Sequence, residues 1–349
     1  MIQINCPSNI ETLKENHWNW FLKRIKTKNG PKSSSWNPNI TYLDFLQRVL
    51  NVQTLDELRD GFILADYNVL KNKKTITIDS NPTNAITIPE DDKPERWKNK
   101  NFLSDKECLE EIFDYNSFSN SQDSKWNAYL FCSGMKVFVC PYCNRQYIFV
   151  VGSSKDKHAR PEIDHFFPKE KYPFLALSFF NFIPSCHSCN HTKNAKEETI
   201  VYPYKEGFSN DAKFELCISR NGTKTKIQKH DIFNAKSWVN DLSCFIDYNK
   251  TTAIVKKISK SIEMFNLEIL YKEHKIEMEN LVFRCQLLYH TLQNLQNWQL
   301  QLNSIIGMCN VDAETVIMGS PINIAQNVEF PLRKFNKDIT EQLKKILGI

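Results

Sequence analysis

Two Cys-x2-Cys pairs constrain the fold of this chain more than any other feature of its 349 residues. One pair, Cys140 and Cys143, stands in the segment CPYCNRQY, and the other, Cys186 and Cys189, stands in CHSCNHTK. Each pair can turn two sulfurs toward one point, and four thiolates are a common tetrahedral donor set for Zn²⁺. The spacing therefore predicts one closed structural zinc site. The alternative is that these are four ordinary buried cysteines, since Cys is a frequent core residue.

The remaining cysteines form no such pair, and we expect them in the core: Cys6, Cys108, Cys132, Cys217, Cys244, Cys285 and Cys309. An odd total of 11 argues against a disulfide framework and for reduced thiols. The N-terminal segment has no basic start followed by an apolar stretch. The longest apolar run, FLALSFFNFI, is far shorter than the roughly 20 residues of a membrane span. These features predict a cytoplasmic protein with no membrane partner.

Composition is that of a globular chain, with 41% hydrophobic and 24% charged residues, and the length allows two or three compact regions. A net charge of +5 is only a weak indication of an anionic partner. Between 211 and 260, ten Lys and Arg stand against five Asp and Glu. This local excess could contact phosphates, or it could be a solvated face.

Polar residues lie between the two cysteine pairs and directly after the second. Asp164 and His165 end a short apolar run, and Asn181 follows in FFNFIP. Three more come directly after Cys189, namely Asn190, His191 and Lys193. A zinc ion that joined the two pairs would close the intervening segment into a loop and bring these residues together.

These residues carry a resemblance. The pattern Asp-His-x-x-Pro at 164–168, Asn181, and Cys-x2-Cys-Asn-x-x-Lys at 186–193 resembles the HNH endonucleases, whose ββα-metal motif is often stapled by two zinc knuckles. The resemblance covers 140–198. More loosely, the layout resembles the PtuB-type nucleases of anti-phage systems such as Septu, which work beside an ATPase. The resemblance to HNH endonucleases implies a metal-dependent phosphodiesterase, with DNA favoured over RNA, a structural Zn²⁺ and a catalytic Mg²⁺ or Mn²⁺. The looser resemblance implies an ATPase partner protein.

The resemblance assigns the central chemistry to two neighbouring residues. His165 would be the general base, a role that suits an imidazole titrating near neutrality, and Asp164 would ligate the catalytic metal. Neighbouring residues on a strand point to opposite faces, so both can reach one site only where the strand ends or bends. Pro168 is consistent with a strand that ends there.

The other roles also follow from the resemblance. Asn181 would brace the loop and the orientation of His165, and Lys193 would touch a phosphate. The last metal ligand of the family is often His; here Asn190 holds that position, with His191 beside it as the alternative ligand. Taken singly, His165 could be a packing residue and Asn181 the cap of a turn. Nothing in the pattern requires His158 or His187.

The fold class predicted is α+β and mostly helical. Region 1–130 is expected to be mainly helical, 131–205 to be an HNH core stapled by the four-cysteine site, and 206–349 to hold short strands and then long helices. Within the core we expect strands at 145–151 and 160–166 and a helix that begins near Ser188. Beyond it we expect β-like segments at 214–219 and 251–258. A helix of about 40 residues follows, with an apolar stripe at Leu281, Cys285, Leu288, Leu292, Leu295 and Leu302.

Three functions stay open at this point. The first is an endonuclease that cleaves DNA, and the second is an HNH nuclease that cleaves RNA or tRNA. The third is a non-catalytic zinc-stabilised protein that binds nucleic acid or takes part in an assembly. The Asp164-His165 pair favours an enzyme, because a binding module has no use for a base beside a metal-binding carboxylate.

Overall fold

A computed structural model describes residues 1–26, 42–78, 86–87, 102–121, 125–152, 156–234, 240–248, 254–293 and 330–348. The chain divides into two compact units. One, here called the motif unit, comprises 6–136 and 149–197, and the other, here called the sheet unit, comprises 1–5, 137–148 and 198–349. None of the described helices is both long and apolar enough to cross a bilayer. Both α-helices and small sheets occur, in agreement with a mixed α and β fold.

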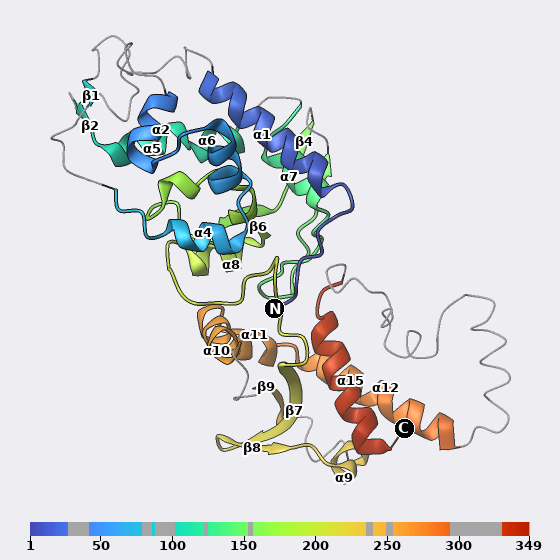
Figure 1. Ribbon diagram of the computed structural model, residues 1–349. Helices are drawn as coiled ribbons and strands as arrows, with labels where there is room; N and C mark the ends of the chain where they lie inside the picture. Colours follow the sequence, from blue (N-terminus) through green and yellow to red (C-terminus); the bar gives the residue numbers. More distant parts are fainter. Residues whose placement is uncertain are drawn as a thin grey trace. The chain divides into compact units, whose positions relative to one another are not determined.

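Most of the regular secondary structure described in the motif unit is helical (Figure 1). They are α1 (Ile10–Lys26), α2 (Tyr42–Leu50), α3 (Leu55–Leu58), α4 (Tyr67–Lys73), α5 (Asp105–Ile112), α6 (Tyr115–Ser119), α7 (Ala128–Met135) and α8 (His187–Lys193). Side-chain caps explain where several begin, because a capping oxygen satisfies an otherwise unpaired backbone N–H. Thr54, Asp66, Asp114 and Asn127 each accept such a bond, and Ser104 forms a full capping box with Glu107.

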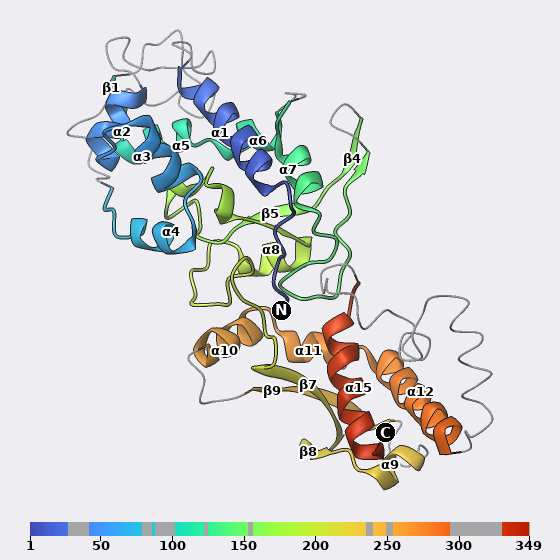
Figure 2. The ribbon, with the colours of Figure 1, turned by 45° about the vertical axis from the view of Figure 1, so that its right-hand side comes forward.

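Strands in this unit pair locally. They are β1 (Ile86–Thr87) with β2 (Phe102–Leu103), β3 (Val151–Gly152) with β4 (Lys157–Ala159), and β5 (Glu162–His165) with β6 (Phe182–Ser185), all antiparallel. In the last pair His165 lies opposite Phe182. Helix α8 follows β6 directly, so the chain forms two antiparallel strands and then a helix, and Figure 2 shows α8 beside β5. Aromatic rings fill the space behind β6, among them Phe118, Phe131 and Phe179.

The sheet unit is built on three antiparallel strands in the order β8-β7-β9. Their bounds are β7 (Ala212–Arg220), β8 (Thr223–Lys226) and β9 (Leu242–Tyr248). The helices are α9 (Lys229–Phe233), α10 (Val255–Met264), α11 (Leu267–Lys272), α12 (Lys275–Gln293) and α15 (Arg333–Leu347). Helix α15 packs along β7 (Figure 2), where Phe335 contacts Phe214.

Two predicted strands are wrong. Residues 145–150 form no regular strand, and only Val151 of the predicted segment belongs to one, β3. Asn144 adopts a left-handed conformation (φ 52°) that turns the chain back, and an isolated bridge joins Tyr147 to Val139. Part of the β-like segment 251–258 is instead the start of α10. There Ile258, Ser261 and Met264 are buried at helical spacing, and this amphipathic pattern outweighs the strand preference of β-branched residues.

Other expectations on the fold have mixed outcomes. The strand at 160–166 appears as β5, the strand at 214–219 lies within β7, and α8 begins one residue before Ser188. The long C-terminal helix is described only as α12, on which Leu281 and Cys285 are buried. The rest of its predicted stripe, and Cys309, lie outside the residues whose side chains are described. The three-region division stays a prediction.

Candidate metal centre and nuclease-like site

Local hydrogen bonds shape each cysteine pair. After the first pair the backbone N–H of Asn144 donates to the Cys140 carbonyl at 2.8 Å, and the Cys140 N–H donates to the Gln146 carbonyl at 3.0 Å. In the second pair Cys186 is the N-cap of α8, and the Asn190 N–H donates to its carbonyl at 3.0 Å. Turns of this kind direct both sulfurs of a pair to the same side, and a helix N-terminus favours the thiolate form.

The four sulfurs of Cys140, Cys143, Cys186 and Cys189 lie within 4.8 Å of one another, and all four residues are buried. Tetrahedral zinc with bonds of about 2.3 Å needs sulfurs about 3.8 Å apart, so small side-chain rotations bring this set to zinc geometry. Among the described residues no second group of three or more His, Cys, Asp or Glu ligand atoms converges in this way. The cysteines therefore fit a structural metal such as zinc, as the sequence predicts.

Asp164 lies on the side of β5 that faces α8. Its carboxylate accepts a hydrogen bond from Lys193 Nζ at 3.0 Å, and the same ammonium donates to the His165 carbonyl at 2.7 Å. Both side chains are buried, with exposed fractions of 1% for Lys193 and 3% for Asp164. The structure thus joins the predicted metal ligand and the predicted phosphate contact as a buried ion pair.

His165 is the last residue of β5, and its ring lies among aromatic rings. Tyr115 and Phe182 contact it edge to face, with ring centroids 4.6 and 5.4 Å away. Its Nε2 lies 2.9 Å from the Ala176 carbonyl oxygen. Because a carbonyl can only accept, Nε2 must carry the proton and Nδ1 the lone pair. Burial lowers the pKa of His165 to about 3, against a smaller rise from the Ala176 bond, so the imidazole is neutral near pH 7.

Asn181 holds the loop that follows His165. Its Oδ1 accepts the N–H of Phe167 at 2.7 Å, while its Nδ2 donates to the carbonyls of Phe167 at 3.0 Å and Leu175 at 2.9 Å. The side chain is fully buried. These three bonds tie both ends of the segment 167–175, which includes Pro168, to the start of β6. This geometry suits the brace that the sequence assigns to Asn181.

Asn190 and His191 lie on different sides of α8. Asn190 Nδ2 donates to Glu162 Oε2 at 2.6 Å, whereas the ring of His191 stacks on that of His187. His187 in turn lies 2.7 Å from Glu162 Oε1. Of Asn190 and His191, Asn190 is therefore the one with a hydrogen bond to β5. The choice between the two as metal ligand stays a prediction.

Glu162 is a residue that the sequence reasoning missed. It stands two positions before Asp164 on β5, so alternation places both carboxylates on the same face of the strand. Hydrogen bonds to Asn190 and His187 lower the pKa of Glu162, although partial burial acts in the opposite direction and is the largest single influence. The i, i+2 spacing of Glu162 and Asp164 is a signal that could have found it.

A cavity of about 230 Å³ is walled in part by residues that contact the ring of His165, although His165 itself does not line it. Tyr115 and Ala176, which both contact that ring, belong to the wall of the cavity, together with Lys169 and Glu170 from the loop after Pro168. Polar groups of the motif loop and of α6 therefore surround the space next to the predicted base.

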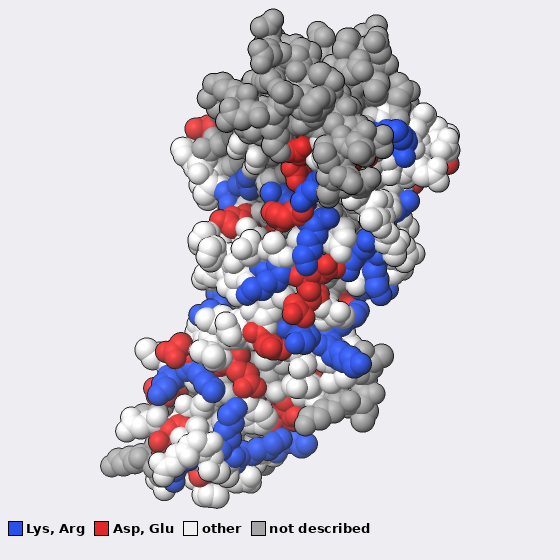
Figure 3. Space-filling view, turned by 90° about the vertical axis from the view of Figure 1, so that its left-hand side faces the viewer, with Lys and Arg blue, Asp and Glu red and all other residues white. Residues whose placement is uncertain are grey.

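The basic excess at 211–260 is largely paired. Acidic partners neutralise six of these side chains, namely Lys213, Arg220, Lys224, Lys226, Lys257 and Lys260. Figure 3 shows Lys and Arg interspersed with Asp and Glu over the face in view, not gathered into one basic patch. The local excess of charge therefore gives little support for a phosphate-binding surface in this segment.

Comparison with known proteins finds a partial similarity. The chain is similar to Septu protein PtuB of Bacillus thuringiensis, with 32% identity over 117 residues. The match covers 31% of this chain and 44% of PtuB, so the chain spans less than half the length of that relative. No family model matches the chain, and no solved structure matches it. The similarity to PtuB agrees with the looser of the two resemblances drawn from the sequence.

Proposed function

We propose that this protein is a zinc-stabilised, metal-dependent endonuclease of the HNH type that cleaves DNA in anti-phage defence. One observation carries the proposal. His165, the last residue of β5, is a neutral imidazole whose Nε2–H donates to the Ala176 carbonyl. It follows directly after Asp164, whose carboxylate lies on the side of β5 that faces α8. The similarity to PtuB supports the defence role. An ATPase partner protein is part of the proposal on the resemblance drawn from the sequence alone.

His165 would act through Nδ1. With Nε2 engaged by Ala176, this atom has a lone pair that can accept a proton from an attacking water. The ring cannot turn freely, because Tyr115 and Phe182 contact it edge to face and its Nε2–H donates to the Ala176 carbonyl. Such fixed orientation is what general-base catalysis requires.

The side of β5 that faces α8 offers oxygen donors of the kind that Mg²⁺ and Mn²⁺ prefer, from Asp164, Glu162 and the amide of Asn190. A bound divalent ion would supply stabilisation of the negative charge that develops on the phosphate. Lys193 would then exchange part of its contact with Asp164 for a phosphate oxygen while it keeps its bond to the His165 carbonyl.

A second candidate is a non-catalytic, zinc-stabilised protein that binds nucleic acid or takes part in an assembly. The buried pair of Lys193 and Asp164 favours it, because a carboxylate already neutralised by an ammonium can serve the fold alone. The two functions differ in what the chain does to a nucleic acid once it is bound.

The test is incubation of the purified protein with supercoiled plasmid and, separately, with total RNA, each with Mg²⁺, Mn²⁺ or EDTA. The proposal predicts nicked and linear plasmid with Mg²⁺ or Mn²⁺ and intact plasmid with EDTA. Cleavage of RNA alone would replace DNA by RNA as the substrate. Binding without cleavage of either polymer, in a gel-shift assay on the same samples, would favour the second candidate.

A further inference from the structure

Three consecutive backbone carbonyls beside the candidate site each accept a hydrogen bond from a side chain. The Leu175 carbonyl accepts from Asn181 Nδ2 at 2.9 Å, and the Ala176 carbonyl accepts from His165 Nε2 at 2.9 Å. The next carbonyl, that of Leu177, accepts from His17 Nε2 at 2.8 Å. Two of these donors are predicted site residues, whereas His17 comes from α1, about 150 positions earlier in the chain.

The tautomer of His17 is fixed on both sides. The indole N–H of Trp126, which can only donate, lies 3.0 Å from His17 Nδ1, and the Leu177 carbonyl, which can only accept, faces Nε2. His17 is fully buried, and burial lowers its pKa to about 4. It is therefore a neutral imidazole whose single proton points at Leu177.

A second contact links the two histidines. The ring of Phe182 lies edge-on to both, with centroids 5.7 Å from His17 and 5.4 Å from His165. Phe182 is itself paired with His165 across β5 and β6. A shift of His17 would therefore reach His165 by two routes, through the peptide between Ala176 and Leu177 and through the Phe182 ring.

We propose that His17 is a positioning residue for His165. By holding the Leu177 carbonyl it fixes the adjoining peptide, and so the Ala176 carbonyl that sets the direction of the His165 ring. This inference rests on the nuclease function proposed above. Its effect is expected on catalysis and not on substrate binding, because a displacement of about 1 Å at a catalytic group can cost about 10²-fold in rate.

Variants at His17 separate the effect of its N–H donor from the effect of its side-chain volume. His17→Gln keeps an N–H donor near the position of Nε2 and should retain kcat within about threefold of the wild type. His17→Leu removes the donor and should lower kcat about 10- to 100-fold with KM nearly unchanged. Leu58→Ala, at a buried position of α3 away from this network, serves as a control that lowers stability without touching the carbonyls. If His17→Leu does not fold, Trp126→Phe, which removes the donor to Nδ1, takes its place with an expected loss of several-fold.

Nitrogen NMR of the histidine side chains gives a readout that does not depend on cleavage. In the wild type and in His17→Gln, His165 should show the Nε2–H tautomer as a single sharp species. In His17→Leu, or in Trp126→Phe, its signals should shift or broaden, whereas in Leu58→Ala they should not. An unchanged His165 spectrum together with unchanged kcat would overturn the inference. If the wild type cleaves nothing but the variants still show these spectral changes, the proposed function is refuted and the positioning contact remains.

Discussion

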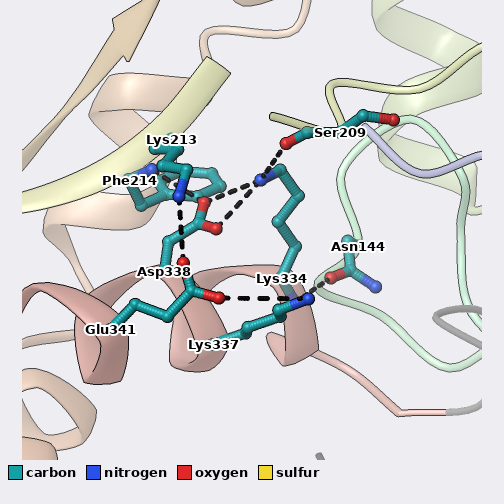
Figure 4. A network of polar contacts seen from close by, with 8 residues as sticks. All are labelled: Asn144, Ser209, Lys213, Phe214, Lys334, Lys337, Asp338 and Glu341. Carbon is teal, nitrogen blue, oxygen red and sulfur yellow. Dashed lines mark hydrogen bonds and ion pairs between the residues drawn. The ribbon is translucent and has the colours of Figure 1, made fainter. Parts of the chain in front are cut away.

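Two buried Lys–Asp pairs, one in each unit, share the same chemistry but differ in their partners. Lys334 and Asp338 stand one turn apart on α15 with a closest distance of 2.8 Å, and Lys193 and Asp164 join α8 to β5 at 3.0 Å. Figure 4 shows the first pair within a polar network. There Lys334 Nζ also donates to the Ser209 carbonyl, and Asp338 accepts the Phe214 N–H of β7.

Partners distinguish the two pairs. The partners of Lys334 and Asp338 described here are backbone groups and side chains that fasten α15, among them Asn144, which accepts the Lys334 N–H. Desolvation lowers the pKa of Lys334 and raises that of Asp338, which means that burial disfavours the charged form of both groups. Lys193 instead bonds to the carboxylate and the carbonyl of the two predicted catalytic residues. Burial alone therefore does not distinguish the two pairs, and we propose that the identity of the partners separates a structural pair from a functional one.

The largest expected effect is on cleavage. Asp164→Asn keeps the shape of the side chain but removes the charge that would hold a divalent ion, and we expect the cleavage rate to fall at least about 10³-fold. Asp338→Asn, the matched change in the other pair, should leave the rate within about threefold. Single-turnover plasmid cleavage measures both. An Asp164→Asn protein that cuts within tenfold of the wild type would remove this carboxylate from the mechanism.

Next in size is an effect on stability. Removal of one partner of a buried pair typically costs about 3–5 kcal/mol, so Lys334→Met and Lys193→Met should each lower the free energy of unfolding by about that amount. Millimolar Mg²⁺ should restore about 1 kcal/mol or more to Lys193→Met, because the ion can neutralise Asp164, and nothing to Lys334→Met. Urea titrations with and without Mg²⁺ measure this, and equal responses of the two variants would erase the distinction between the pairs.

Acid should act on the motif unit through His17. Its pKa is lowered from 6.5 to about 4 in the folded protein, so the unfolded chain binds the proton more readily. The stabilisation is present above pH 6.5 and is lost as the pH falls from 6.5 toward 4, by about 3 kcal/mol in all. The raised pKa of Asp338 has the opposite sign, since protonation there is easier in the folded state.

His17→Gln isolates this contribution, because it removes the titrating group and leaves the rest of the chain unchanged. As the pH is lowered from 7 to 4.5, the free energy of unfolding of the wild type should fall relative to that of the variant. Denaturant unfolding at four or five pH values measures it. A difference that does not change with pH would show that His17 titrates normally.

Local sequence signals located the four-cysteine cluster and the segment of two strands and a helix. The spacing within each cysteine pair is short-range information, and so are the pattern Asp-His-x-x-Pro at 164–168 and the helix start next to the second pair. By contrast, the contacts of His17 and Tyr115 with the motif join segments far apart in the chain, and no periodicity reports them. Residues 255–258 show the other limit, because the β-branched residues of this segment favoured a strand while tertiary packing selected a helix.

The most direct test of the central claim is a comparison of His165→Ala with the wild type at equal zinc content. We expect about one zinc per chain in both proteins, unchanged affinity for DNA in gel shifts, and a cleavage rate about 10²- to 10⁴-fold lower in the variant, because the base acts only in the transition state. A His165→Ala protein that holds its zinc and cuts plasmid within a few-fold of the wild-type rate would contradict the account.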